Sequence, residues 1–251
     1  MKIQIITSPR MGSTYFYDML KTFYAPYQNF MQWKEVFNLN NRKPTHDIDK
    51  IIHDAYTNTD VVATNHINYF DRLSQQQKET FFNLGWYNIV LLRRNFLDCS
   101  ISLAKSTVTN EWSKYTQNKI TVPIEIFDSS LNAIFHNVKN IIHNQYNIPY
   151  KEVVYYENLT FNPETDFHNL KLSKTYNMEQ YKDWYPEIDF YKYNSSIVSA
   201  PSKKDTIANY DELVEYAESQ YHKFTSKRFK IKQGFIRRIN IDTQYIDISE
   251  F

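Results

Sequence analysis

Residues 3–14 of this chain read IQIITSPRMGST, an apolar run that leads into a short loop ending in Gly-Ser-Thr. The six residues that follow, YFYDML, are typical of a helix. A strand, a tight loop and a helix in this order bring the N–H groups of a helix N-terminus to the end of a strand, where they can hold a phosphate or sulfate group. Gly12 allows the backbone to approach an oxyanion closely, and Arg10 can neutralise its charge. Ser13 and Thr14 can donate hydrogen bonds, although an ordinary strand-to-helix turn explains the stretch equally well when it is taken alone.

Length and charge set the broad class. The 251 residues are enough for one large α/β domain, with or without a small appendage, and can bury a core without disulfides. The 29 basic and 28 acidic residues give a net charge of +1, so no nucleic-acid partner is expected and any affinity for anions must come from local clusters of charge. Cys99 is the only cysteine, which excludes a disulfide within the chain and a cysteine-based zinc site. The opening residues do not resemble a signal peptide and no run of about 18 apolar residues occurs, so we expect a cytoplasmic protein without a transmembrane helix.

The spacing of apolar residues predicts strands that alternate with helices. Strands are expected at 2–7, 60–64, 86–92 and 151–156, and helices at 12–23, 46–56, 74–84, 95–106, 122–146 and 205–221. This alternation predicts an α/β fold with a mostly parallel central sheet flanked by helices. Residues 25–44 are predicted to be a loop with a short apolar island at 30–33. Residues 1–224 are expected to form one domain, and residues 225–251 a basic and aromatic appendage that belongs to it.

Three polar groups stand at the predicted carboxyl ends of parallel strands, where open sheets bind their ligands. They are the Arg10 loop, Asn65-His66 and Arg93-Arg94. Residues 94–102 read RNFLDCSIS, so Ser102 follows Arg94 by eight positions and falls in the next predicted helix. An arginine fork suits a phosphate and a serine hydroxyl adds a donor. Taken alone, this segment is better explained by arginines that pair with surface carboxylates.

Together, the two segments resemble the nucleotide-binding motifs of sulfotransferases that use 3′-phosphoadenosine 5′-phosphosulfate (PAPS). SPRMGST at 8–14 is similar to their 5′-phosphosulfate loop, and RNFLDCSIS at 94–102 to their 3′-phosphate motif. KEVFN at 34–38 resembles the Glu-x-Phe segment of the bacterial carbohydrate and glycolipid branch, and VVYYENL at 153–159 resembles a strand segment common in the family. The resemblance covers about residues 1–160 and implies the P-loop NTPase-like sulfotransferase fold.

The resemblance implies PAPS as sulfuryl donor, adenosine 3′,5′-bisphosphate as product and a hydroxyl acceptor on a sugar, glycolipid or other small molecule, with no metal. The donor-binding residues that it implies are Pro9, Arg10, Met11, Gly12, Ser13, Thr14, Arg94 and Ser102. Arg10 is in addition expected to stabilise charge on the leaving phosphate. Glu35 matches the catalytic glutamate of the bacterial branch, and His66 matches the strand-end histidine of the cytosolic members. We favour Glu35 as the general base and keep His66 as the alternative.

The chain departs from the family pattern in several places. Arg10 stands where the cytosolic members have lysine, Phe96 replaces a frequent proline, and Thr64 replaces the lysine that precedes the strand-end histidine. No Arg-Lys-Gly segment occurs near the C-terminus, and Lys203 and Lys204 are the residues that can substitute for it.

Two other functions stay open. A P-loop kinase is disfavoured because the first loop lacks the lysine and the first glycine of a Walker A motif, and no strand ends in an evident magnesium-binding aspartate. A non-catalytic relative that acts as a binding protein is the other alternative. Trp33 and Trp112 either line an acceptor pocket or belong to the core.

Overall fold

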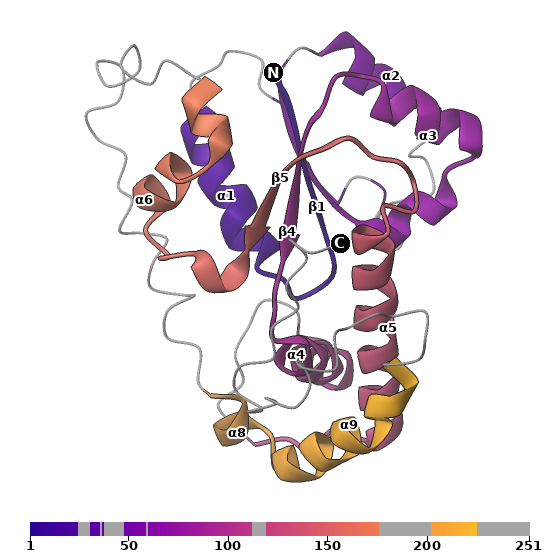
Figure 1. Ribbon diagram of the computed structural model, residues 1–251, viewed down its shortest axis with the longest axis vertical. Coiled ribbons are helices and arrows are strands. Elements are labelled where there is room, and N and C mark those ends of the chain that lie inside the picture. Colours follow the sequence, from indigo (N-terminus) through magenta and orange to yellow (C-terminus); the bar gives the residue numbers. More distant parts are fainter. Residues whose placement is uncertain are drawn as a thin grey trace. The chain divides into compact units, whose positions relative to one another are not determined.

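The computed structural model describes residues 1–24, 31–35, 37, 48–58, 60–111, 119–175 and 202–224 (Figure 1). They belong to two compact units. The first unit contains residues 1–7 and 12–91 and the described part of 146–200, and the second contains residues 8–11 and 92–145 and the described part of 201–251. The predicted appendage at 225–251 lies outside the described residues. Within the described ranges, none of the helices has the length and apolar character that crossing a membrane requires.

The first unit is built on a sheet of five strands in the order β2-β3-β1-β4-β5. The strands are β1 (Lys2–Thr7), β2 (Met31–Lys34), β3 (Val61–His66), β4 (Tyr87–Leu92) and β5 (Tyr150–Tyr155). Strand β1 pairs in parallel with β3 and β4, and β2 pairs in parallel with β3. The described helices flank the sheet, which confirms the predicted α/β class with a parallel central sheet. The middle strands are buried on both faces, as the continuous apolar run at 89–92 predicts.

The prediction of a loop at 25–44 was wrong at residues 31–34, which form the edge strand β2. Met31 pairs with Val61 and Lys34 pairs with Thr64. Four residues are too few to show a strand periodicity, and the hydrogen bonds that stabilise β2 come from the distant strand β3. Trp33 is buried and its ring centroid lies 6.5 Å from that of Trp86, so Trp33 belongs to the core. Trp112 lies outside the described residues.

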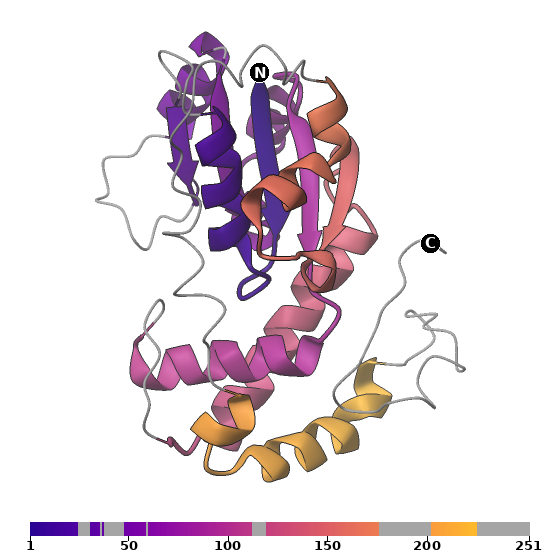
Figure 2. The same cartoon turned by 90° about the vertical axis from the view of Figure 1, so that its left-hand side faces the viewer.

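Helices cover both faces of the sheet. Helices α1 (Ser13–Tyr24) and α6 (Pro163–His168) lie on one face, and α2 (Ile48–Thr57) and α3 (Gln75–Phe82) lie on the other (Figure 2). The described residues of this unit also form the 3-10 helices η2 (Ile67–Arg72), η3 (Tyr156–Asn158) and η4 (Lys171–Thr175). Ser74 is the N-cap of α3, as predicted, and forms a capping box with Gln77.

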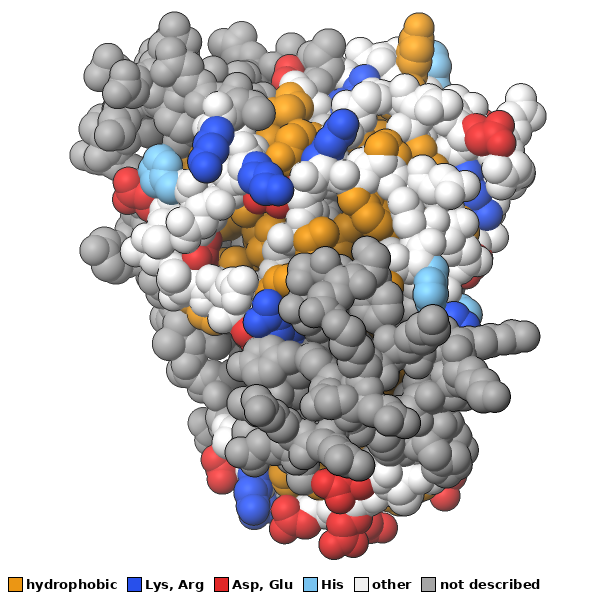
Figure 3. All heavy atoms as spheres, viewed as in Figure 1, with side chains coloured by type: hydrophobic (Ala, Val, Ile, Leu, Met, Phe, Trp, Pro, Cys, Tyr) orange, Lys and Arg blue, Asp and Glu red, His pale blue; other side chains and the backbone are white. Residues whose placement is uncertain are grey.

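The second unit consists of α4 (Phe96–Thr109), α5 (Ile124–Ile142), α8 (Lys203–Thr206) and α9 (Tyr210–Phe224). Its core joins α4, α5 and α9 through Leu97, Ile101, Phe127, Leu131 and Leu213, among others. The opposite face of α9 is acidic and exposed, and Figure 3 shows these side chains in red over that helix. The predicted helix at 205–221 is interrupted because Ile207 forms a parallel bridge with Ile120, so α9 begins only at Tyr210.

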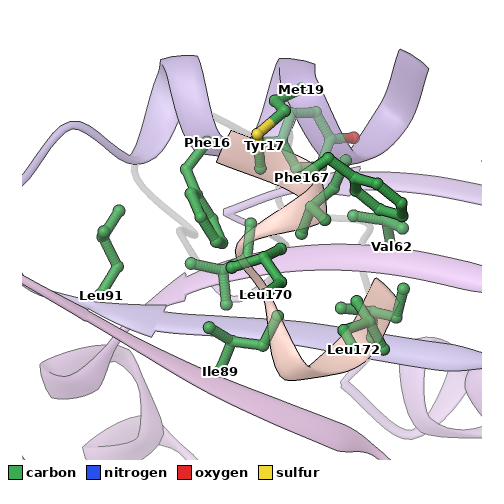
Figure 4. Packing of buried hydrophobic residues seen from close by; sticks show 12 residues of the cluster. Phe16, Tyr17, Met19, Val62, Ile89, Leu91, Phe167, Leu170 and Leu172 are labelled. Carbon is green, nitrogen blue, oxygen red and sulfur yellow. The ribbon is translucent and has the colours of Figure 1, made fainter. Parts of the chain in front are cut away.

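Helix α1 is fixed against the sheet by apolar packing in the first unit. Phe16, Tyr17 and Met19 contact a buried cluster that includes Val62 of β3 and Phe167 of α6 (Figure 4). The cluster also contains Ile3, Ile5, Leu20, Ile89, Leu91, Leu170 and Leu172. Because α1 is held along its length, its N-terminal turn has a defined position relative to the sheet.

A buried carboxylate fixes the start of α1. The hydroxyl of Tyr15 donates to Oδ2 of Asp166 at 2.6 Å. Asp166 also accepts from the backbone N and hydroxyl of Thr160 at 2.7 and 2.8 Å and from the backbone N of Phe161 at 3.0 Å. Burial and Asp166 raise the pKa of Tyr15 far above its ordinary value, so the phenol keeps its proton and donates at every physiological pH. Ser13 and Thr14 therefore lie in a well-anchored first helical turn.

Position 12 requires glycine for two reasons, its backbone conformation and the lack of space for a side chain. Its φ is +86°, in the left-handed region that glycine adopts without steric cost. A Cβ atom on Gly12 would lie 2.3 Å from Cδ2 of Tyr156. Tyr156 follows β5 and belongs to the segment 153–159 that carries part of the family resemblance. The loop glycine and this aromatic segment are thus in direct contact within the first unit.

Replacement of Gly12 by Ala should destabilise the protein more than the matched replacement of Gly85. Gly85 has a φ of +75°, and no atom lies within 4 Å of the position that a Cβ would take there, so Gly85→Ala costs only the left-handed strain, about 1–2 kcal/mol. Gly12→Ala adds a steric overlap with Tyr156, and overpacking of this kind costs about 1–3 kcal/mol more. Urea unfolding of both variants measures the difference. Equal losses in the free energy of unfolding of the two variants would show that the Tyr156 ring moves away from the new Cβ atom without cost.

Candidate functional site

Of the residues predicted to bind the donor, Pro9, Arg10, Met11, Arg94 and Ser102 belong to the second unit, whereas Gly12, Ser13 and Thr14 belong to the first. In the first loop, Arg10 has a φ of +65°, which is unusual for a residue other than glycine. The loop is held to the start of α4 by sulfur contacts. The backbone N of Arg93 lies 3.0 Å from Sδ of the buried Met11, and Sγ of Cys99 lies 3.6 Å from the carbonyl oxygen of Arg10. Met11 and Cys99 thus support the loop rather than face a ligand.

A hydrogen bond joins the two predicted anion-binding segments. Nε of Arg10 donates to Oγ of Ser102 at 2.9 Å, across 92 positions of sequence. Ser102 is buried on α4, and Asn95 caps this helix by accepting from the backbone N of Asp98 at 2.9 Å. The structure thus brings Arg10 and Ser102 together.

The two adjacent arginines have different surroundings. Arg93 forms an ion pair with Asp98, the first acidic residue of α4. Arg94 is half-buried, and its carbonyl oxygen accepts from the backbone N of Phe96 at 3.1 Å. The expected pairing with a carboxylate is therefore present at Arg93. Arg94 stands at the position of the 3′-phosphate motif.

Two lysines add positive charge to this cluster. Burial lowers the pKa of Lys105, and Arg10 lowers it further while Glu111 raises it. Burial also lowers the pKa of Lys203; Asp98 raises it, whereas Arg93, Arg10 and Lys105 lower it. Arg10, Arg93 and Lys105 thus act on Lys203, and Arg10 acts on Lys105, as neighbouring positive charges. We call Arg10, Arg93, Lys105 and Lys203, together with Ser102, the anion cluster.

Cations held together in partly buried positions raise one another's energy, and a bound anion relieves that cost. The anion cluster is therefore suited to a ligand with more than one negative group. Lys203 was considered from the sequence, but Lys105 was missed. The signal that could have found it is spacing, because Lys105 follows Ser102 by three positions and shares its helix face.

The two candidates for the general base lie side by side in the first unit. Glu35 follows β2, and its backbone N donates to the carbonyl oxygen of Thr64 at 2.7 Å, which extends the strand pairing by one residue. His66 is the last residue of β3. Nε2 of His66 lies 3.6 Å from Oε1 of Glu35. Thr7, where the Arg10 loop begins, is the pairing partner of His66.

Two residues of η2 complete this group. The ring centroids of Tyr69 and His66 are 5.0 Å apart, and the guanidinium carbon of Arg72 lies 5.4 Å from the centre of the Tyr69 ring. Burial lowers the pKa of His66, against an opposing effect of Glu35. Burial and the charge of Glu35 raise the pKa of Tyr69 to about 12, although Arg72 lowers it. We call Glu35, His66, Tyr69 and Arg72 the base cluster.

Buried polar atoms without partners concentrate at this end of β3. They are Oγ1 of Thr64, Nδ2 of Asn65, Nδ1 of His66 and Oδ1 of Asn68. Within the described part of the chain, none of these four atoms has a hydrogen-bond partner. Leaving a buried polar atom unpaired costs about 1–3 kcal/mol, so such a concentration indicates a place that binds water or a ligand.

The remaining predicted residues lie in the first loop and at the start of α1. Pro9 is half-buried in the turn, and Ser13 and Thr14 begin α1. Across the described ranges, no group of three or more His, Cys, Asp or Glu residues is arranged to hold a metal ion.

Comparison with known proteins adds no relative. No protein-family model matches the chain, and no curated protein matches it.

The buried His66 should make the stability of the protein fall at mildly acidic pH. Histidine in an unfolded chain takes up a proton near about pH 6.5, whereas burial lowers the pKa of native His66. Below pH 6.5 the unfolded state then binds more protons, and the free energy of unfolding falls with pH until the native pKa is passed. We expect this fall to be steeper in the wild type than in His66→Gln, as measured by urea unfolding at about pH 7.5, 6.5 and 5.5. Parallel declines would contradict a neutral, buried His66.

Proposed function

We propose that this protein is a sulfotransferase that moves the sulfuryl group of PAPS to a hydroxyl acceptor, with adenosine 3′,5′-bisphosphate as the second product. The observation that supports this most strongly is the hydrogen bond of 2.9 Å between Arg10 and Ser102. It joins the two segments that resemble the 5′-phosphosulfate loop and the 3′-phosphate motif, although they are far apart in the sequence. A sequence resemblance alone would not require that contact.

The anion cluster suits the charge of the donor. PAPS carries a phosphate at its 3′ position and a phosphosulfate at its 5′ position, so it needs cations in more than one place. Arg10 and the first turn of α1 serve the 5′ end in this proposal, because helix N-termini and arginine forks stabilise oxyanions. Arg94 and Ser102 serve the 3′-phosphate, and Lys203 adds the charge that the family draws from its Arg-Lys-Gly segment.

The transfer itself is an in-line displacement at sulfur. The acceptor oxygen forms a bond to sulfur, and its proton passes to the carboxylate of Glu35. The bond between sulfur and the bridging phosphate oxygen breaks, and that oxygen leaves with the electron pair. Charge grows on the leaving phosphate, where Arg10 stabilises it. Every role in this step belongs to a residue of the anion cluster or of the base cluster.

The donor site can be tested with single variants of its cations. Arg94→Ala should weaken the binding of adenosine 3′,5′-bisphosphate about 10- to 150-fold, the effect of losing a charge-assisted hydrogen bond of about 1.5–3 kcal/mol. Lys203→Ala should also weaken binding, while the neighbouring Lys204→Ala is the matched control. Lys204 is exposed and pairs with Asp211 at 3.5 Å, so its loss should leave the affinity unchanged. Fluorescence titration measures all three. Wild-type affinity in Arg94→Ala would refute the role given to Arg94.

The chemical step can be tested at Glu35. Glu35→Gln keeps the size of the side chain but cannot take a proton, so turnover should fall about 100-fold or more while the affinity for the bisphosphate is retained. Transfer of radiolabelled sulfate from PAPS across a panel of sugars, glycolipids and phenols measures turnover. Undiminished turnover in Glu35→Gln would remove Glu35 as the base. A wild type that binds no nucleotide and sulfates no acceptor would instead favour a binding protein.

A further inference from the structure

The base cluster contains two side chains that can accept a proton, and the two differ in how far they are exposed to solvent. The side chain of Glu35 is 25% exposed, whereas that of His66 is 9% exposed. Nδ1 of His66 is enclosed and has no hydrogen-bond partner among the described residues. An acceptor molecule can therefore reach the carboxylate of Glu35, but it cannot reach Nδ1 of His66 in this arrangement.

The carboxylate also decides which nitrogen of His66 carries the proton. Nε2 is the nitrogen that faces Oε1 of Glu35, at 3.6 Å. If Nε2 held a lone pair, two electron-rich atoms would face each other, so the proton lies on Nε2 whenever Glu35 is ionised. This holds for neutral and for charged His66 alike. The spacing is longer than that of a formed hydrogen bond, as is common for catalytic groups before a substrate binds.

A series of contacts fixes the orientation of His66 relative to the segment that carries Glu35. The Tyr69 ring packs against His66 with an angle of 33° between the ring planes, and Arg72 lies over the Tyr69 ring. Nη1 of Arg72 donates to the carbonyl oxygen of Phe37 at 3.4 Å. The backbone N of Phe37 in turn approaches Oδ1 of Asn65 at 3.4 Å. The segment that carries Glu35 is thereby tied to the strand and the 3-10 helix that carry the other three residues.

Glu35 needs such support because its backbone is in a costly conformation. Its φ of +52° lies in the left-handed region, which a non-glycine residue adopts only when its surroundings impose it. Tyr69 and Arg72 of η2 are two of the charged or titratable groups near the pair. The raised pKa of Tyr69 keeps its phenol protonated near neutral pH.

On the basis of the proposed function, we propose that His66 is a positioning residue for Glu35 rather than a second base. Nε2–H of His66 donates to Oε1 of Glu35 and orients the carboxylate for the acceptor hydroxyl. Tyr69 and Arg72 are the residues that keep the imidazole in this orientation. The proton of the acceptor passes to Glu35, and His66 keeps its own proton throughout.

The first test needs no substrate. NMR of the full chain labelled with ¹⁵N-histidine reports the tautomer of each ring, and His66→Gln identifies the signals of His66 by their loss. We expect the Nε2–H tautomer above the pH at which the ring is protonated, with a smaller preference in Glu35→Gln. A predominant Nδ1–H tautomer would overturn the proposal. This result stands whether or not the protein transfers sulfate.

The second test measures kinetics with PAPS and the best acceptor of the panel. His66→Leu removes the donor and should lower kcat about 10- to 100-fold, the effect of a misplaced catalytic group. His66→Gln places an amide Nε2 donor at the same distance along the side chain and should restore most of kcat. A loss in His66→Gln as deep as that in Glu35→Gln would make His66 the base and refute the positioning role.

Tyr69 supplies a matched pair of variants. Tyr69→Phe keeps the ring against His66 and should lower kcat less than Tyr69→Leu, which removes the ring and should act like His66→Leu. The donor KM should stay constant in both, since Tyr69 belongs to the base cluster alone. Equal activity of the two variants would show that the ring does not orient His66. If the wild type sulfates no acceptor, the proposed function fails, and the tautomer measurement still decides the relation of His66 to Glu35.

Discussion

The hydrogen bond between Arg10 and Ser102 is the interaction on which the proposed donor site depends. The backbone of Arg10 has a left-handed conformation that costs about 1–2 kcal/mol. This conformational cost is offset by the burial of Met11 and by the contacts that Met11 and Cys99 make between the loop and the start of α4. The result is a cation fixed in place before any ligand arrives. Preorganised charge of this kind is what stabilises a leaving phosphate, since no reorganisation is needed during the reaction.

Preorganisation also explains how the sheet positions the two candidates for the general base. Parallel strands end at one edge, so residues at the ends of β2 and β3 meet there although they are about thirty positions apart in the sequence. Glu35 and His66 are brought together in this way, and they differ in burial. In the proposed mechanism the more exposed carboxylate meets the acceptor, while the buried imidazole, with its lowered pKa, acts through its N–H. The unpaired polar atoms between Thr64 and Asn68 mark the same edge as a place where a polar ligand is stabilised.

Much of the fold could be read from the sequence, because its signals are local. The apolar run of β4, the Ser74 cap and the turn at Gly85 are encoded by neighbouring residues. Strand β2 could not be read, since four residues acquire their structure from β3. In the candidate site, the motif spacing predicted Arg10, Arg94 and Ser102, and the structure brings Arg10 and Ser102 into contact. Lys105 was not predicted, because its spacing from Ser102 gives the shared helix face but not its burial near Arg10. Likewise, the sequence left Glu35 and His66 as alternatives, and only the structure shows that they lie 3.6 Å apart at adjacent strand ends.

The most direct measurement is a calorimetric titration of the full wild-type chain with adenosine 3′,5′-bisphosphate in the presence of EDTA, set against ATP with magnesium. A donor site built from Arg10, Arg94, Ser102 and the two lysines predicts one bisphosphate per chain without any metal. It also predicts weaker binding of adenosine 5′-monophosphate, which lacks the 3′-phosphate. Tighter binding of ATP with magnesium, or equal affinity for the mono- and bisphosphate, would contradict the sulfotransferase proposal at its foundation.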